Sequence, residues 1–333
     1  MSAADVPFAA ERVGVERWRR WLRLHAWTVA VWLVFLMMLP YWRSVSSGSF
    51  SFDFQNLVIG ALPLCFAAMA QAVVVISGGI DLSVGSLIGL MNVVSARWMV
   101  DMSLGRALLF VLLCLVLSGL AGTLTGLIVV TTRIPDIVVT LGMLFVWYGV
   151  ALWVLTIPGG GAPQQLYDFV QGTVGSTSIP WALVLVLVVW GSFWLSIRWL
   201  RPGLSIYAVG SNRNAAYLSG IHVARTRVGA YALCGVLCGL GGMALTTTSF
   251  LGDPNAGRIY TLNSVAAIVL GGVSLLGGVG GLIGPVGAAF ILTLINTILL
   301  QRGTDPNYAA VYTGVIIIVV VMIGGLLERR GRT

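Results

Sequence analysis

Polar side chains that can hold a solute by hydrogen bonds are spread through the apolar segments of this 333-residue chain. Hydroxyl and amide groups at such positions suit an uncharged, hydroxyl-rich solute, because they donate and accept hydrogen bonds without carrying charge. The alternative for any single one of them is a hydrogen bond to a neighbouring helix. The candidate solute-path residues are Gln71, Ser77, Asp81, Ser83, Asn92, Thr140, Asn263, Ser264 and Asn296.

Two aspartates, Asp81 and Asp136, are the carboxylates with apolar segments close on both sides. Ionisable groups at such places are functional candidates, but both also fit a helix start, where a carboxylate accepts backbone N–H groups. For Asp81 both interpretations stay open, a helix cap or a hydrogen-bonding group on the solute path. The chain has no series of Asp, Glu and His suited to a proton relay, which argues against a proton-coupled carrier.

Other chemistry-bearing residues point away from catalysis. The four cysteines, Cys65, Cys114, Cys234 and Cys238, fall inside apolar segments without a neighbouring histidine or carboxylate. We expect small core residues there and no metal. Lysine is absent, and a Walker-type phosphate loop needs a lysine to reach the β- and γ-phosphates. The sequence therefore predicts no catalytic residues and no cofactor, and any ATP that drives transport must bind another polypeptide.

The composition indicates the fold class. Hydrophobic residues make up 58% of the chain and charged residues 9%, whereas a soluble domain carries about a quarter charged residues. The net charge of +8 lies in arginines at segment ends, so it is not the footprint of a nucleic-acid partner. We predict an all-α polytopic membrane protein embedded in a lipid bilayer.

About ten transmembrane helices are expected, since each apolar segment approaches the ~20 residues that cross the hydrocarbon. A glycine break, Gly78-Gly79, separates the second segment from the third. Small residues four apart favour close helix packing, and they occur as Gly85 and Gly89, Gly122 and Gly126, and Gly235 and Gly239. The predicted spans are 24–42, 55–76, 82–100, 106–130, 137–157, 181–199, 228–250, 262–276, 283–300 and 308–327.

The arginines predict the orientation in the membrane. With the N-terminus inside, 14 arginines fall on the inner side and five on the outer side, and the loop 158–180 has none. Basic residues favour the cytoplasmic side, so both termini are expected there. The predicted organisation is a cytoplasmic tail 1–23, a transmembrane domain 24–328 with a cytoplasmic loop 201–227, and a cytoplasmic tail 329–333.

The loop 201–227 and its flank hold five arginines, Arg198, Arg201, Arg213, Arg225 and Arg227. Its middle predicts a short helix on the membrane surface, which Asn212 or Asn214 can cap and Gly220 can end. Such a helix would be available to a cytoplasmic partner. The alternative is a solvated loop whose arginines only set the topology.

A short internal echo relates the two halves of the chain. Gly78-Gly79-Ile80-Asp81-Leu82 is similar to Gly271-Gly272-Val273-Ser274-Leu275, and each stretch precedes a Leu-Ile-Gly. Broken helices at matching places in two halves can mark a transport site. The echo is glycine-biased, and chance is the alternative explanation.

Four motifs resemble one family: VVVISGGIDLSVGSLIGL (73–90), IVVTLGM (137–143), AVGSNRNAAYLSGIHV (208–223) and SVAAIVLGGVSLLGGVGG (264–281). The family is the permease subunits of bacterial ABC importers for ribose, arabinose, xylose, galactose, rhamnose and autoinducer-2. The resemblance extends from about residue 55 to 328, and the two glycine motifs together are highly specific.

The resemblance implies a multi-pass permease of the bacterial inner membrane. Its implied partners are a cytoplasmic ABC ATPase, a periplasmic solute-binding protein, and a second permease copy or paralogue. It implies ATPase coupling through the loop 208–223, with the candidate residues Gly210, Asn212, Asn214, Ala215, Ala216, Ser219 and Gly220.

The chain departs from the family pattern at three places, and two other classes of function compete with the permease. The family usually has an apolar aromatic at Asp136, often an arginine at Tyr148, and an acidic pair around Thr261-Leu262-Asn263. The competing functions are a secondary carrier or channel working without an ATPase, and a membrane scaffold. A scaffold explains poorly why two glycine-broken segments have polar residues nearby.

Overall fold

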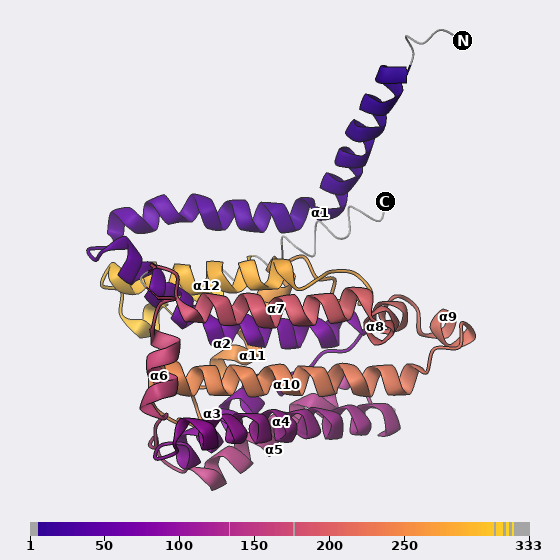
Figure 1. Cartoon of the computed structure of the whole chain (residues 1–333). Coiled ribbons are helices and arrows are strands. Elements are labelled where there is room, and N and C mark those ends of the chain that lie inside the picture. The colour runs from indigo at the N-terminus through magenta and orange to yellow at the C-terminus, as the bar shows by residue number, and fades with distance from the viewer. Residues whose placement is uncertain are drawn as a thin grey trace.

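The computed structural model describes residues 6–132, 134–175, 177–309, 311–315, 318, 319 and 322. Over this part of the chain the named elements are all α-helices, and extended residues pair only at two isolated bridges. The all-α prediction is therefore confirmed. Figure 1 labels the helices α1 (Val6–Val45), α2 (Phe50–Ile76), α3 (Val84–Trp98), α4 (Leu104–Thr132), α5 (Asp136–Val154), α6 (Gln164–Gln171), α7 (Trp181–Trp199), α8 (Arg201–Ser211), α9 (Arg213–Leu218), α10 (Val223–Ser249), α11 (Arg258–Leu270) and α12 (Ile283–Gln301).

The seven helices that are long and apolar enough to cross a membrane, among the described residues, are Ala26–Val45 of α1 and the helices α2, α4, α5, α7, α10 and α12. The predicted span 82–100 contains α3, which has 15 residues. The predicted span 262–276 overlaps only part of α11, which has 13 residues and ends at Leu270, so the predicted end of this span was wrong. Both helices are shorter than the ~20 residues that a complete crossing needs. The described residues include only part of the predicted span 308–327. They do not include Arg133 or the predicted tail 329–333.

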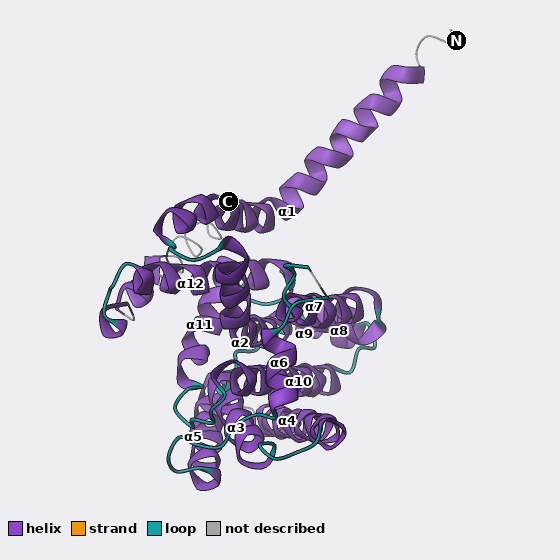
Figure 2. Cartoon of the chain, turned by 60° about the vertical axis from the view of Figure 1, so that its left-hand side comes forward, coloured by secondary structure: helices purple, strands orange, loops and turns teal. Residues whose placement is uncertain are grey.

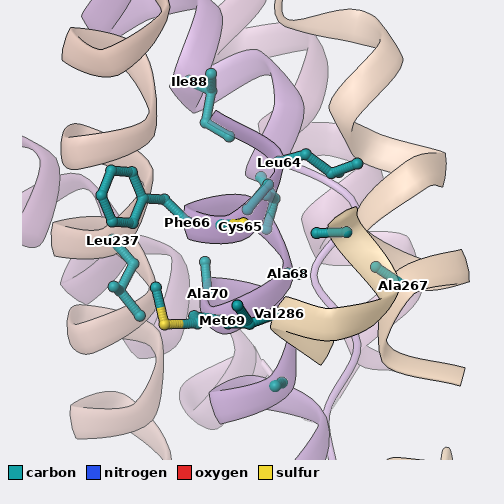
Figure 3. Close-up of a cluster of buried hydrophobic side chains, with 14 of the residues drawn as sticks. Leu64, Cys65, Phe66, Ala68, Met69, Ala70, Ile88, Leu237, Ala267 and Val286 are labelled. Atoms are coloured by element: carbon teal, nitrogen blue, oxygen red, sulfur yellow. The ribbon is translucent and has the colours of Figure 1, made fainter. Parts of the chain in front are cut away.

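Helix α2 is the centre of the bundle. It is apolar around its whole circumference, as expected of a helix covered on all sides, and every residue of 61–76 is buried. It packs against α10, α12, α11 and α7. Figure 3 shows this core, in which side chains of α2 meet Ile88 of α3, Leu237 of α10, Ala267 of α11 and Val286 of α12.

Helices α4 and α10 lie side by side at glycines (Figure 1). A Cβ on Gly122 would be 3.0 Å from the Cα of Gly235, and a Cβ on Gly126 would be 2.9 Å from the Cβ of Tyr231. A side chain at either position would force the backbones apart. The predicted close packing at these glycines is therefore confirmed.

Helix α1 lies along the outside of the bundle. The ring of Phe35 is 5.6 Å from that of Phe290 on α12, and the indole N–H of Trp27 donates to the carbonyl of Leu270 at 2.7 Å. These contacts hold the part of α1 from Ala26 onward. Its first turns, which cover residues 6–23 of the predicted tail, extend away from the bundle in both views (Figures 1 and 2).

The connections gather at two ends of the bundle. At the end that we call the basic end, the loops 77–83 and 271–282 meet α8 and α9, and the N–H of Gly278 donates to the carbonyl of Ile76 at 2.9 Å. At the opposite end, Gly159 and Gly252 exchange backbone hydrogen bonds of 3.0 and 2.9 Å, and the N–H of Gly161 donates to the carbonyl of Ala96 at 3.0 Å. This arrangement agrees with helices that cross in alternate directions.

Candidate solute path and coupling segment

Helices α2 and α11 end in the same backbone turn. Their last helical residues are followed by Ser77 and Gly271, with φ of −75° and −73°. Gly78 and Gly272 come next, and both have a φ of +79°, which glycine adopts without a Cβ clash. In both turns the following N–H bonds to the carbonyl five residues earlier, at 3.1 and 2.9 Å, which is the Schellman pattern.

The internal echo is real in structure, but its predicted register was wrong by one residue. The sequence match aligned Gly78 with Gly271, whereas the turns pair Gly78 with Gly272. Asp81 therefore corresponds to Leu275 and not to Ser274. Both stretches contain closely spaced glycines, so their sequences can be aligned in either register. Only the position of the glycine with a positive φ shows which alignment the structure follows.

Asp81 lies buried between the end of α2 and the start of α3. Its Oδ1 atom accepts hydrogen bonds from the backbone N–H and the hydroxyl of Ser83, at 2.8 and 2.6 Å. The cap position of α3 itself is Ser83, so Asp81 orders the turn before the helix and is not its first cap residue. The Oδ2 atom lies 3.7 Å from the thiol sulfur of Cys234 on α10.

Asp136 forms an ion pair with Arg227 and does not cap α5. The cap position of α5 is Pro135, without a side-chain hydrogen bond. The carboxylate instead contacts the guanidinium of Arg227 on α10 and accepts a 3.2 Å hydrogen bond from the hydroxyl of Tyr231. Gly79 lies directly beside this group, since a Cβ there would be 2.7 Å from the carboxylate. The ion pair thus joins α5 and α10 at the first glycine break.

The coupling segment, α8 and α9, contacts both glycine breaks through the backbone. A Cβ on Gly277 would lie 2.8 Å from the Cα of Gly78 and 2.9 Å from the carbonyl oxygen of Gly210 on α8. Three glycines from three segments therefore meet at one point. The guanidinium of Arg213 on α9 donates to the carbonyl of Gly78 at 2.8 Å.

Tyr207 fixes α8 to the second break. Its hydroxyl donates to the carbonyl of Gly280 at 2.9 Å. Burial raises the pKa of Tyr207, and the nearby charge of Arg198 opposes this shift. The hydroxyl therefore keeps its proton and its role as a donor at physiological pH.

The short helix predicted in the basic loop is present as α9. The side-chain oxygen of Asn212 accepts the N–H of Ala215 at 3.0 Å, and Gly220 follows the helix with a φ of +81°. The cap is therefore Asn212, and the alternative Asn214 was wrong. The predicted coupling residues of 212–220 are exposed, with the exception of Ala216.

Ala216 and its neighbours face opposite ways. Ala216 is 4% exposed and packs against the chain itself, whereas Tyr217 and Leu218 are 71% and 84% exposed. Large apolar side chains that the described chain leaves uncovered beside a basic segment make this surface a candidate docking site. The coupling residues predicted from the sequence are the small and polar residues of this segment and do not include these two. The signal was available, because they are apolar residues in an otherwise polar stretch.

A cavity of about 490 Å³ lies between α2, α11 and α12. Gly60 and Leu64 of α2 line one wall, and the predicted solute-path residues Asn263 and Asn296 line it together with Thr293. Arg258 and Pro306 place its mouth at the end of the bundle opposite the basic end. No carboxylate is among the lining residues that the structure describes, and the volume falls in the range of about 300–1,000 Å³ typical of small-molecule sites.

The other candidate solute-path residues are scattered. The amide nitrogen of Asn92 donates to Thr246 and to the carbonyl of Leu251, both at 3.0 Å. The hydroxyl of Thr140 lies 2.9 Å from the carbonyl of Asp136 in its own helix and 3.2 Å from the carbonyl of Ile80. The two bonds of Asn92 tie α3 to α10 and to the residue Leu251 that follows it. The hydroxyls of Ser77 and Ser264 donate to carbonyls of their own helices.

Gln71 is fully buried in α2, and its amide has no hydrogen-bond partner among the described residues. It shares one face of α2 with Gly60 and Leu64, since positions i, i+4 and i+11 align on a helix. The amide is thus placed between the cavity and the glycine break.

One departure from the expected family pattern, Tyr148, lies at the opposite end. Tyr148, at a place where arginine is frequent, donates to the side-chain oxygen of Asn255 at 2.8 Å. The guanidinium of Arg258 lies over its ring, 5.3 Å from the centroid. A positive charge is therefore supplied here from α11.

The profile of the family described as "Branched-chain amino acid transport system / permease component" matches residues 54–321. The chain is 32% identical over 264 residues to the ribose import permease protein RbsC of Escherichia coli (strain K12), which is 77% of this chain and 80% of that protein. No solved structure matches the chain.

Two further relatives cover more of the chain. It is 31% identical over 295 residues to the galactose/methyl galactoside import permease protein MglC of Escherichia coli (strain K12), with 84% of this chain and 88% of that protein covered. It is 29% identical over 313 residues to the fructose import permease protein FrcC of Rhizobium meliloti, with 90% and 86% covered.

Proposed function

Because the chain belongs to the family described as branched-chain amino acid transport system permease components, we propose that it is the membrane-spanning permease subunit of an ABC importer for a sugar or sugar-like solute. The relatives named above are import permeases for ribose, galactose or methyl galactoside, and fructose. ATP hydrolysis belongs to a partner chain, which the absence of lysine supports.

The lining of the cavity carries the choice of a sugar over an amino acid. Asn263, Thr293 and Asn296 offer neutral donors and acceptors, which match hydroxyl groups that also donate and accept. An amino acid would bring an ammonium group that needs a carboxylate or several acceptors. The described lining residues include no carboxylate, and their one cation, Arg258, lies over the ring of Tyr148. Neutral hydroxyl chemistry fits this cavity better.

The unpartnered amide of Gln71 indicates which way the solute moves from the cavity. A buried amide without a partner loses about 1–3 kcal/mol, and a passing hydroxyl group would recover part of it. Gln71 lies on the α2 face that lines the cavity, displaced toward the glycine break. The solute would move from the cavity past Gln71 toward Ser77, Asp81 and Ser83 at the basic end.

We place the basic end in the cytoplasm. Arg198, Arg201, Arg213, Arg225 and Arg227 belong to it, and basic residues favour that side. The division proposed from sequence, a tail 1–23, a transmembrane domain 24–328 and a tail 329–333, agrees with this orientation. About ten crossings are proposed, with α3 and α11 as short partners in the helix breaks.

The proposed partners follow from the two ends. A cytoplasmic ATPase docks on the coupling segment, where Tyr217 and Leu218 are exposed and the backbone joins both glycine breaks. A periplasmic solute-binding protein docks over the mouth of the cavity at the opposite end. A second permease copy or paralogue completes the membrane part.

Reconstitution tests the proposal. The chain is placed in vesicles with the proposed ATPase and binding protein, and uptake of labelled ribose, galactose and fructose is measured with and without ATP. We expect uptake of one sugar that needs all the partners. Uptake of equal rate without the ATPase would show a carrier or channel acting alone and would overturn the proposal.

A further inference from the structure

A long apolar groove of about 840 Å³ runs between α4 and α10 beside the start of α8. Its walls are aliphatic and include Leu112, Val116 and Leu120 of α4 and Val236 of α10. The wall of α4 is continuous with exposed leucines, Leu109, Leu113 and Leu117, on the outer surface of that helix. The groove therefore opens onto the membrane.

The polar side chains that line the groove are Thr123, Ser205, Arg225 and Thr226. The hydroxyls of Thr123 and Ser205 donate to carbonyls of their own helices. Arg225 is the charged group of the lining. It lies in the first turn of α10, at the basic end of the groove, so the groove is apolar along its length and cationic at one end.

The length of the groove corresponds to one leaflet. Arg225 and Val236 are eleven residues apart on α10, which is about 16 Å at 1.5 Å per residue. Half of a hydrocarbon core of about 30 Å is about 15 Å. An acyl chain that begins at Arg225 therefore reaches the middle of the bilayer at Val236.

Arg225 also lines a second cavity of about 510 Å³, whose polar lining residues besides it are Arg213, Tyr217, His222 and Arg227. Arg213 is bound to the carbonyl of Gly78, and Arg227 is paired with Asp136. Arg225 has no side-chain partner among the described residues. Arg225 thus lies between an apolar groove and a basic pocket. A guanidinium at such a place can bind a phosphate group, since it forms two parallel hydrogen bonds with it.

We propose that an anionic phospholipid of the leaflet at the basic end binds here, with one acyl chain in the α4–α10 groove and its phosphate at Arg225. Basic pockets between membrane helices on the cytoplasmic side are suited to anionic headgroups. The bound lipid touches Pro202 and Ile206 of α8. It thereby fills the space between the coupling segment and α10.

Two substitutions separate the two halves of this site. Arg225→Gln removes the charge at an exposed position and leaves the groove intact. Gly229→Leu fills the groove, because Gly229 lines it and a Cβ there meets no atom within 4 Å. The matched controls are Arg106→Gln at the far end of α4, and Gly191→Leu on α7, where a Cβ also meets nothing within 4 Å.

The test counts lipids on the purified full chain by native mass spectrometry, after exchange into micelles with equal amounts of dioleoyl phosphatidylglycerol and dioleoyl phosphatidylcholine. We expect phosphatidylglycerol to bind about fivefold more tightly, which corresponds to ~1 kcal/mol for one arginine near the surface. Arg225→Gln should abolish this preference. Gly229→Leu should remove the bound lipid of either kind, while both controls keep it.

An unchanged preference in Arg225→Gln, or equal losses in the controls, would overturn the proposal. Displacement of phosphatidylglycerol by free glycerol phosphate, with equal effect in the wild type and in Gly229→Leu, would show a site for soluble phosphate and would also overturn it. Gel filtration of each variant reports on folding. Because Arg225 is exposed, Arg225→Gln should fold normally. This variant therefore tests the proposal even if Gly229→Leu fails to fold.

Discussion

The carboxylate of Asp136 pairs with the guanidinium of Arg227, and this pair joins the first turn of α5 to the first turns of α10. Both side chains are largely buried, and the pair lies beside the backbone of Gly79. A buried pair that loses one member leaves an uncompensated charge, whereas loss of both members is often close to neutral.

The ion pair should therefore show strong coupling in a double-mutant cycle. Asp136→Asn or Arg227→Gln alone should lower the free energy of unfolding by about 3 kcal/mol, near the lower limit for buried pairs. The double substitution should recover most of that loss. Thermal unfolding in detergent measures all four proteins, with Arg302→Gln as an exposed control. Additive losses in the double variant would contradict the pairing.

Asp81 should tolerate Asn and not Ala. Its Oδ1 accepts two hydrogen bonds from Ser83, and the side-chain oxygen of Asn can accept both. Asp81→Asn should keep most solute uptake, whereas Asp81→Ala should lose on the order of 1 kcal/mol of stability, as caps do. Uptake and membrane abundance are measured together. A collapse of uptake in Asp81→Asn at normal abundance would assign the charge to the transport path.

Replacement of Tyr217 and Leu218 should weaken docking of the ATPase on α9. Their joint replacement by serine removes exposed apolar area without disturbing the core, so the permease should insert normally while solute-stimulated ATP hydrolysis falls at least severalfold. Ala216→Glu should instead reduce the amount of folded protein, because Ala216 faces the chain itself. The matched control is Ile157→Ser, an exposed apolar residue at the opposite end. Full ATPase stimulation in the Tyr217/Leu218 variant would place the docking site elsewhere.

The cavity should lose solute affinity when its amides are removed. Asn263→Leu and Asn296→Leu each delete neutral hydrogen-bonding groups, and an unmade hydrogen bond costs about 1–3 kcal/mol. We expect the half-saturating solute concentration in the reconstituted importer to rise about tenfold. Thr297→Val is the control, because its hydroxyl bonds to the carbonyl of Thr293 within α12. Equal effects of all three would indicate helix damage and not loss of solute contacts.

Labelling of introduced cysteines should assign the two ends to opposite sides of the membrane. The four native cysteines are buried, so a membrane-impermeant maleimide should react only with an added one. Ile157→Cys should react in intact cells, and Leu218→Cys only after the membrane is opened. Reaction of both in intact cells would refute the orientation.

The sequence alone was sufficient for the helical class, the close glycine packing and the helix of the basic loop, whose cap it left open between Asn212 and Asn214. Apolar length, small residues four apart and cap chemistry are local signals, and they do not depend on distant contacts. The two glycine breaks were also visible, since a positive φ after a helix calls for glycine.

What the sequence could not supply were contacts between distant residues. Asp136 and Arg227 are 91 residues apart, and no local pattern distinguishes an ion pair from a helix cap. The orientation of Ala216 relative to Tyr217 depends on how α9 packs onto the bundle. Asn263 and Asn296 line one cavity, whereas most of the other candidate path residues are scattered for the same reason, because helical faces are assigned only when the helices are packed.

The meeting of Gly78, Gly210 and Gly277 makes a joint without side chains. Side chains in contact can accommodate a movement by changing rotamers. Three backbones in direct contact cannot adjust in this way. If the coupling segment is displaced, both helix breaks must therefore move with it. An alanine scan removes nothing from a glycine, so the usual survey of side chains would pass over this joint; only substitutions that add atoms can reveal it.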